Sequence, residues 1–285
     1  MFRQRFFSWL ILWSVTLGII FIAPPWVDWT ILTLVGLWGQ GEFYHAQHAK
    51  GIHVYKKMGL LFGLLWFLGI AFFMVHRPEL SSWLPFYFLG LLSLMILTIL
   101  SRHVLFYTQS PNPIAEQAGT LMGFFYVPVL FGYVGLIDFM NTHRFDTSMA
   151  VLYLLAVTKF TDVGAYVVGK LIGKHKMIPH ISPGKTWEGF CGGVAISTLL
   201  SVGLAHSIPG LELLQGMHAW ILGILISLGS VIGDLAESVV KRDAHVKDSG
   251  HAIPGIGGIL DLIDSLIFTA PILYLYLKLL PYLHG

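Results

Sequence analysis

The sequence predicts an all-α, polytopic integral membrane protein with about nine transmembrane helices. Hydrophobic residues make up 55% of the 285 residues and charged residues only 11%, whereas a soluble domain carries about 25% charged residues. The apolar residues also form long blocks, such as 84–100, which hold almost no ionisable group and approach the length of a bilayer span. So few charges cannot cover a water-soluble fold, and we expect lipid to surround most of the chain.

Apolar runs bounded by charge, proline or glycine give the expected spans. They cover residues 7–23, 25–41, 58–75, 84–106, 119–140, 148–171, 189–208, 217–240 and 258–281. The first two are short and meet at Pro24 and Pro25, which predicts a hairpin. The first run follows Arg3 and Arg5, as in a signal peptide, but no A-x-A-like cleavage site precedes the second run. We therefore expect an uncleaved first span.

Basic residues predict the orientation of these spans. With a cytoplasmic N-terminus, thirteen of the 17 Lys and Arg residues fall on the cytoplasmic side, and the other side holds only Arg77, Arg144 and Lys278. The polar connections 170–188 and 241–258 then face the cytoplasm, and the C-terminus lies outside. The net charge of +2 and the lack of a basic run give no sign of nucleic-acid binding.

Ionisable residues inside a span cost about 2.5–3.5 kcal/mol each, so they need a partner, an aqueous cavity or a function. Lys159 and Asp162 lie three residues apart on one face of the 148–171 helix, and Tyr166 follows one turn later. An internal ion pair between Lys159 and Asp162 is the alternative to a functional role.

The 170–188 connection contains groups that suit phosphate binding. Lys185 supplies a point charge, and Ser182 and Thr186 supply hydroxyls before Glu188, at a helix start whose free N–H groups favour an anion. The string Gly184-Lys185-Thr186 matches only the end of a Walker A loop, so we reject a P-loop. A helix start capped by Thr186 or Ser182 is the simpler alternative.

Charged and hydroxyl side chains also gather at the end of the 217–240 helix. Asp234 and Ser238 recur at helical spacing. Lys241 and Arg242 extend this stripe to the membrane surface. An acid, a hydroxyl and a base therefore share one side of the helix.

The next helix opens with two carboxylates, Asp261 and Asp264, three residues apart on one face. Negative charge is favoured near a helix N-terminus, so either carboxylate could simply complement the helix dipole. Together with Asp234 they suit a metal-bound polyphosphate, because hard oxygen ligands hold Mg²⁺ while neighbouring bases hold the remaining phosphate charge. The intervening loop contributes Lys247, Asp248, Gly257 and Gly258.

Residues 155–267 resemble the phosphatidate cytidylyltransferase (CDP-diglyceride synthase) family. The resemblance rests on Ser238-x-x-Lys241-Arg242-x4-Lys247-Asp248, Pro254-Gly255-x-Gly257-Gly258-x-x-Asp261-x-x-Asp264, Asp162…Ala165-Tyr166…Gly169…Gly173, Ser182-Pro183-x-Lys185-Thr186-x-Glu188-Gly189 and Gly233-Asp234-Leu235-x-Glu237-Ser238. Ile256 and Leu262 depart from the pattern, where the family often shows His and Arg, but neither replaces an expected metal ligand. Residues 1–145 agree only in hydropathy, so we divide the single membrane domain, 1–285, into N-terminal helices 1–145 and a catalytic part 146–285.

The resemblance implies a nucleotidyltransferase of phospholipid biosynthesis that converts CTP and phosphatidic acid to CDP-diacylglycerol and pyrophosphate. It implies Mg²⁺ at Asp234, Asp261 and Asp264, with room for a second cation, and catalytic roles for Lys241 and Arg242 beside these carboxylates. The substrate-binding residues would be Asp162, Tyr166, Ser182, Lys185, Thr186, Glu188, Ser238, Lys247, Asp248, Gly257 and Gly258.

The same resemblance places the protein in the cell's inner membrane with its active site facing the cytoplasm. Its expected partners are CTP, phosphatidic acid and the lipid bilayer, with a homodimer among the oligomeric states considered. Two alternatives remain at this point. A CTP-dependent prenol or dolichol kinase also brings a nucleotide to a lipid, and a secondary transporter would use Lys159, Asp162 and Asp234 as an ion path.

Overall fold

A computed structural model of the chain describes residues 2–106, 110, 112–140, 146–246, 249–250, 252–253 and 257–283. It divides into two compact units. The N-terminal unit comprises Met1–Gly135 and Asp243–Leu262, and the C-terminal unit comprises Leu136–Arg242 and Ile263–Gly285. The loop after residue 242, which carries part of the family signature, therefore packs with the N-terminal helices. The predicted division of the domain at residue 145 stays a prediction.

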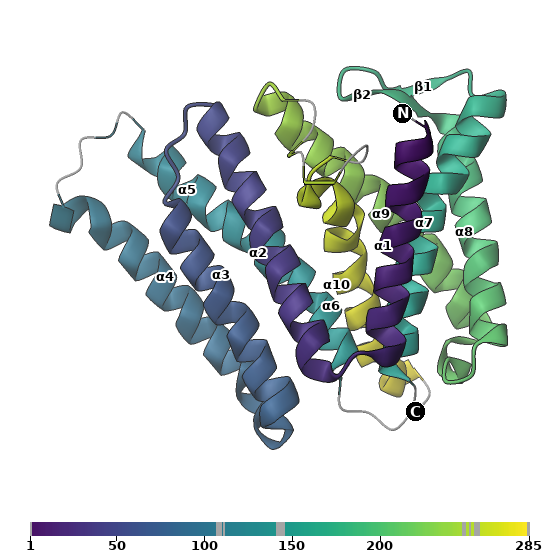
Figure 1. Cartoon of the computed structure of the whole chain (residues 1–285), viewed down its shortest axis with the longest axis horizontal. Helices are drawn as coiled ribbons and strands as arrows, with labels where there is room; N and C mark the ends of the chain where they lie inside the picture. Colours follow the sequence, from purple (N-terminus) through teal and green to yellow (C-terminus); the bar gives the residue numbers. More distant parts are fainter. Residues whose placement is uncertain are drawn as a thin grey trace. The chain divides into compact units, whose positions relative to one another are not determined.

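The N-terminal unit is helical, and its helix α3 packs against α2, α4 and α5. Its core holds the fully buried rings of Phe43, Tyr44, Phe67 and Phe124. The elements, shown in Figure 1, are α1 (Phe2–Ile22), α2 (Pro25–Ala49), α3 (Lys56–Ile70), η1 (Ala71–His76), η2 (Pro78–Trp83), α4 (Leu84–Phe106), α5 (Pro113–Phe124), η3 (Phe125–Val129) and α6 (Leu130–Asp138), the last of which runs into the C-terminal unit.

One expected span of the N-terminal unit contains an irregular turn. The π-helical turn η3 joins α5 to α6 and holds Pro128. Proline has no N–H to donate within a helix, and a π-turn accommodates the missing hydrogen bond without ending the span. The three elements together form one membrane-length segment, Pro113–Asp138.

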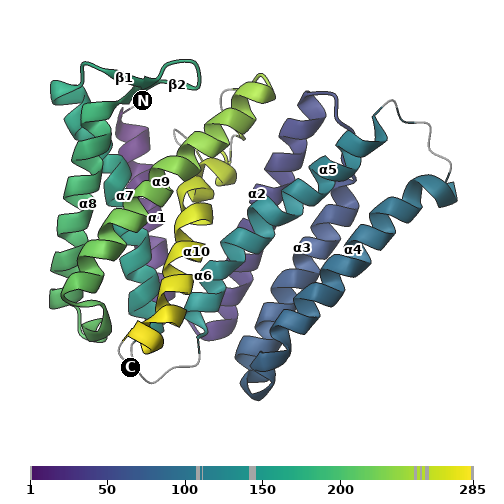
Figure 2. The same cartoon turned by 180° about the vertical axis from the view of Figure 1, so that it is seen from behind.

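The C-terminal unit consists of four long helices and a small hairpin, shown from behind in Figure 2. Its elements are α7 (Thr147–Ile172), β1 (Lys176–Ile178), β2 (Ser182–Thr186), α8 (Trp187–Ser207), η4 (Glu212–Leu214), α9 (Met217–Asp243) and α10 (Ile259–Leu283), of which the first turn of α10 belongs to the N-terminal unit.

The antiparallel hairpin pairs Lys176 with Thr186 and Ile178 with Ser182, inside the connection that we expected to be a loop. Its second strand, Ser-Pro-Gly-Lys-Thr, lacks the alternation of β-branched and aromatic residues by which a strand is recognised in a sequence. The fold is thus helical as predicted, apart from two short strands.

Helices α7 and α8 lie side by side because glycines let their backbones approach (Figure 2). A Cβ atom at Gly189 would lie 2.7 Å from the carbonyl oxygen of Ala165, and one at Gly193 would lie 2.8 Å from that of Thr161. Small residues at the contact are typical of helix pairs in membranes. This contact places the helix that carries Asp162 beside the helix that follows the hairpin.

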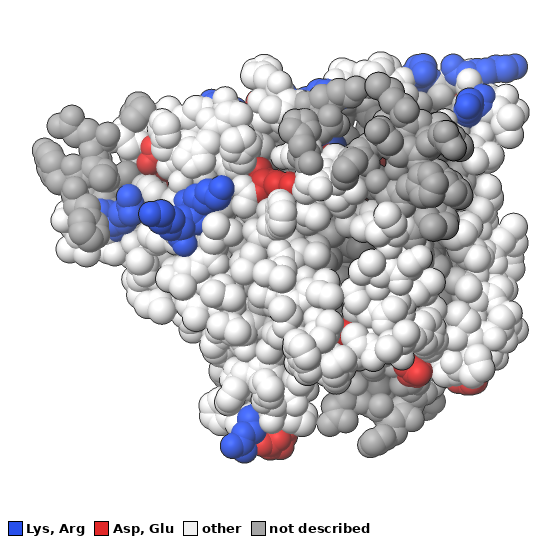
Figure 3. Space-filling view, in the orientation of Figure 1, with Lys and Arg blue, Asp and Glu red and all other residues white. Residues whose placement is uncertain are grey.

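Seven described helices are long and apolar enough to cross a bilayer, which confirms a polytopic, helical membrane protein. They correspond to the third to ninth expected spans. Of the first two, the described residues show only a shorter apolar helical stretch, Ile11–Ile22, so the count of nine and the orientation stay predictions. On the face in Figure 3, white side chains cover most of the described surface and charged ones are few.

Candidate active site

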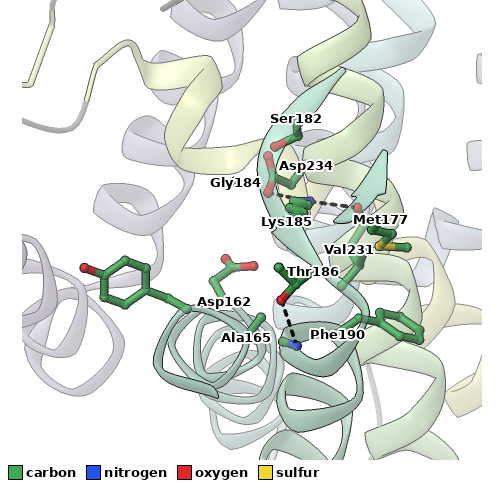
Figure 4. A pocket seen from close by; sticks show the side chains of 12 residues that line it. Asp162, Ala165, Met177, Ser182, Gly184, Lys185, Thr186, Phe190, Val231 and Asp234 are labelled. Atoms are coloured by element: carbon green, nitrogen blue, oxygen red, sulfur yellow. Dashed lines mark hydrogen bonds and ion pairs between the residues drawn. The ribbon is translucent and has the colours of Figure 1, made fainter. Parts of the chain in front are cut away.

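The C-terminal unit contains a cavity of about 380 Å³, within the range of roughly 300–1,000 Å³ typical of small-ligand sites. Three elements turn an ionisable side chain toward it: α7 contributes Asp162, β2 contributes Lys185 and α9 contributes Asp234 (Figure 4). The lining residues are Asp162, Ala165, Tyr166, Met177, Ser182, Gly184, Lys185, Thr186, Gly189, Phe190, Val231 and Asp234. Five of the substrate-binding residues predicted from the sequence, and the predicted ligand Asp234, therefore line one cavity.

Lys185 and Asp234 form an ion pair in this cavity. The Lys185 Nζ atom lies 2.7 Å from Asp234 Oδ2 and 3.5 Å from the carbonyl oxygen of Val231 (Figure 4). Both side chains keep part of their surface accessible, at 23% and 34%. Because an ammonium group has three protons to donate, Lys185 can hold Asp234 and still donate to an anionic ligand in the cavity.

Asp162 meets α9 through a hydroxyl group. Ser230 Oγ lies 3.3 Å from Asp162 Oδ1 and 3.4 Å from the carbonyl oxygen of Thr158. Lys159 precedes Asp162 by three residues on α7, and the ion-pair alternative for these two residues stays a prediction.

A group of three carboxylates lies beside the cavity. Ligand oxygens of Asp234, Glu237 and Asp264 all lie within 4.8 Å of one another, and Glu237 and Asp264 are buried. Their helices come close because of Gly233, where a Cβ atom would lie 2.7 Å from the carbonyl oxygen of Asp264. Three negative groups in apolar helices require positive charge nearby.

Lysine side chains and backbone amides satisfy part of that requirement. Lys241 Nζ lies 2.5 Å from Glu237 Oε2, and Asp264 Oδ1 accepts hydrogen bonds from Ser265 N and Oγ at 2.5 and 3.1 Å. The donor set itself, three hard carboxylate oxygens within reach of one centre, suits Mg²⁺. Sequence reasoning missed Glu237 as a ligand candidate, although its spacing of three residues from Asp234 on one helix was visible.

Other predicted residues have supporting positions. Thr186 Oγ1 accepts from Gly189 N at 3.1 Å and caps α8, which confirms the capping alternative for Thr186. Glu188 accepts from the backbone N–H groups of Lys174 and His175 at 3.1 and 3.2 Å and thereby holds the start of the hairpin. Arg242 Nε donates to the carbonyl oxygen of Ile181 at 3.2 Å, at the turn of the hairpin.

Asp261 lies in the N-terminal unit and has a capping role there. Its Oδ2 atom accepts from Gly258 N at 2.7 Å and from Ser249 N and Oγ at 3.1 and 2.7 Å. Gly257 has a φ of 130°, a conformation that favours glycine. Ser238 lies on α9, and Lys247 and Asp248 lie outside the described residues. The metal-binding role predicted for Asp261 stays a prediction.

The fold and the site together define a helical membrane protein with a cavity lined by two carboxylates and a lysine. The chain belongs to the cytidylyltransferase family, whose model matches residues 3–280, and it is therefore a nucleotidyltransferase. This confirms the resemblance read from residues 155–267. The match also covers the N-terminal helices, which by sequence agreed with the family only in hydropathy.

Individual relatives agree with this assignment. Over 218 residues the chain is 35% identical to the phosphatidate cytidylyltransferase of Staphylococcus aureus (strain COL), covering 75% of this chain and 78% of that one. It is 39% identical over 156 residues to the enzyme of the same name from Bacillus subtilis (strain 168), covering 54% and 55%. It is also 44% identical over 131 residues to the uncharacterized protein YnbB of Escherichia coli (strain K12), covering 46% of this chain and 43% of YnbB.

Proposed function

We propose that this chain transfers the cytidylyl group of CTP to phosphatidic acid and releases pyrophosphate, making CDP-diacylglycerol for phospholipid synthesis. The observation that carries the proposal is the cavity of the C-terminal unit, in which Lys185 and Asp234 meet beside two further carboxylates. The relatives from Staphylococcus aureus and Bacillus subtilis are named for this activity.

The acceptor's chemistry explains why the site needs no protein nucleophile. The phosphate of phosphatidic acid is already an anion at neutral pH, so one of its oxygens attacks the α-phosphorus of CTP in line. The bond from that phosphorus to the oxygen bridging to the β-phosphate breaks, and the electron pair leaves with pyrophosphate. The protein then has two tasks, to align the two phosphates and to offset their negative charge.

Lysine and arginine side chains supply that positive charge. Lys185 already donates within the cavity, and Lys241 and Arg242 follow Asp234 and Glu237 on α9. Mg²⁺ held by the predicted ligands Asp234, Asp261 and Asp264 would add further neutralisation of polyphosphate charge, and Glu237 lies within 4.8 Å of Asp234 and Asp264. In this proposal the clustered carboxylates would also suit a second cation.

The proposed reaction joins a soluble nucleotide to a lipid, so the site belongs at a membrane surface. We assign it to the cytoplasmic side of the inner membrane, with the N-terminus in the cytoplasm and the C-terminus outside. The asymmetry of Lys and Arg between the two sides of the expected spans supports this orientation.

Cysteine-accessibility labelling of intact cells tests this orientation in a Cys191→Ser background, since Cys191 is exposed. Single cysteines at Lys50 and Lys176 should react only after the cell is opened, and those at Glu79 and Glu212 should react with an impermeant reagent from outside. All four positions are exposed, so burial does not limit the reaction. Labelling of positions 50 and 176 from opposite sides would contradict the nine-helix topology.

Product analysis separates the proposed reaction from that of a CTP-dependent lipid kinase. Purified protein supplied with CTP, phosphatidic acid and Mg²⁺ should form liponucleotide and pyrophosphate in equal amounts. Removal of the metal with EDTA should abolish both products, and added Mg²⁺ should restore them. Stoichiometric CDP would instead assign the protein to the kinase class.

A further inference from the structure

Helix α10, which carries two of the proposed ligands, is preceded by a residue that has no side chain to cap it. The residue before it is Gly258, so the free N–H groups of its first turn need other acceptors. Asp261 Oδ2 accepts from Gly258 N at 2.7 Å, and Ser249 Oγ accepts from Asp261 N at 3.3 Å. These two bonds form a capping box in which the hydroxyl comes from the preceding loop instead of the usual cap residue.

Glu42 of α2 completes this cap from a distant part of the sequence. Its Oε2 atom accepts from Leu260 N at 2.8 Å and lies 3.3 Å from Ser249 Oγ, whose one proton is shared between this oxygen and Asp261 Oδ2 at 2.7 Å. The side chain is buried in the N-terminal unit. A Cβ atom at Gly250 or Gly258 would collide with its carboxylate oxygens, so these glycines make room for the carboxylate.

A second contact ties the other end of the same loop to α2. Lys50, at the end of this helix, lies 2.5 Å from Asp243, where the loop begins. This pair is partly exposed and contributes little by itself. Together with the Glu42 contacts it fixes both ends of segment 243–260 on one helix.

We infer that Glu42 is a positioning residue for the proposed cytidylyl transfer, on which this inference rests. It holds Ser249 and the first turn of α10, and through them it fixes the carboxylate of Asp261. A carboxylate buried at this depth is tolerated only where its oxygens are satisfied, and the positive end of a helix dipole favours a negative group. Glu42 contacts Ser249 and Leu260, the residues that hold the candidate metal ligand Asp261 in place. A carboxylate that served only for packing would not need these contacts.

The inference predicts a graded response to substitution. Glu42→Ala should lower kcat about ten- to a hundredfold and raise the Mg²⁺ concentration for half-maximal rate, as loss of a group that orients a metal ligand typically does. Glu42→Gln should stay within about threefold of wild type, because one oxygen makes both contacts and an amide retains such an oxygen. The matched control is Glu116→Ala, which removes another buried carboxylate of the same unit, bonded to Ser110 Oγ at 2.6 Å.

Amide hydrogen exchange in the metal-free, substrate-free protein gives a readout apart from activity. Glu42→Ala should speed exchange at Ser249, Leu260 and Asp261 at least about tenfold and leave α7 and α8 unchanged, whereas the Glu116 control should leave the three amides unchanged. If Glu42→Ala does not accumulate in membranes, Glu42→Asp withdraws the carboxylate by one methylene and should give the same result.

Two results would overturn the positioning role. One is unchanged exchange at Leu260 in Glu42→Ala and Glu42→Asp, and the other is an equal loss of kcat and Mg²⁺ dependence in the Glu116 control. Failure of the proposed function can be told apart from failure of the positioning role. In the first case the wild-type protein would make no liponucleotide, while the exchange measurement would still report on the cap of α10.

Discussion

Replacing Asp234 with Asn is expected to lower kcat at least about a hundredfold while the protein remains folded, and the same is expected of Asp261→Asn. Asn keeps the size and some hydrogen bonding of the side chain but removes the charge that a divalent cation needs. Losses of this size are typical when a group that stabilises charge in the transition state is removed. Turnover at saturating CTP, phosphatidic acid and Mg²⁺, together with the thermal unfolding midpoint, measures both parts of the prediction.

A structural carboxylate of the unit that contains Asp234 provides the control. Asp146 caps α7 by accepting from Ser148 N and Met149 N at 3.0 and 3.2 Å, away from the cavity residues. Asp146→Ala should cost about 1 kcal/mol of stability and leave kcat unchanged. Near wild-type turnover of Asp234→Asn or Asp261→Asn would exclude that residue as a ligand and direct attention to Glu237 and Asp264.

Asp261 needs a second comparison because its Oδ2 atom also caps α10. Ser249→Ala removes the hydroxyl that is shared in this cap but keeps the Asp261 carboxylate. If Asp261 acts only as a cap, the two variants should lose similar stability and keep similar turnover. If Asp261 binds the metal, Asp261→Asn should be the far slower enzyme.

Lys185→Met is expected to lower kcat/KM for CTP at least about a hundredfold. Met keeps much of the length of the side chain but removes the ammonium group that lies 2.7 Å from Asp234 in the cavity. A charge-assisted hydrogen bond to phosphate is lost, and Asp234 loses a neutralising partner. Initial rates at varied CTP in mixed micelles give kcat and KM separately.

Lys176→Met is the matched control, since this exposed lysine lies in the other strand of the same hairpin and outside the cavity lining. It should change kcat/KM less than about twofold, as expected for a solvated surface charge. Equal losses in the two variants would mean that Lys185 acts through the general basic charge of the hairpin and not as a phosphate ligand.

The sequence predicted the apolar helices because their signal is local. Hydropathy located the seven spans from α3 to α10, but it ended the second helix at residue 41, whereas α2 continues to Ala49. The added turns contain Glu42, His45 and His48, which a hydropathy scan excludes from a span. Glu42 is stable there because its carboxylate binds Ser249 and Leu260, about two hundred residues later in the chain.

The site was predictable to the extent that its residues stand in recurrent motifs. Asp162, Lys185 and Asp234 were identified in this way, and the structure brings all three to one cavity. Ser230, the partner of Asp162, and Ser249, the partner of Asp261, were not identified, because a serine shows no distinguishing pattern until the fold supplies its acceptor. The hairpin was missed because cross-strand pairing between Lys176 and Thr186 and between Ile178 and Ser182 stabilises it, and its residues have no strand propensity that a sequence shows.

The most direct measurement of the central claim follows the phosphate oxygens of the lipid. Phosphatidic acid carrying ¹⁸O at its three free phosphate oxygens is converted with unlabelled CTP, and both products are analysed by mass spectrometry and ³¹P NMR. With attack at the α-phosphorus of CTP, CDP-diacylglycerol should retain all three labels, one of them in the bridge between its two phosphorus atoms, and pyrophosphate should have none. Loss of one label to water would show attack at the lipid phosphorus and contradict the proposed reaction.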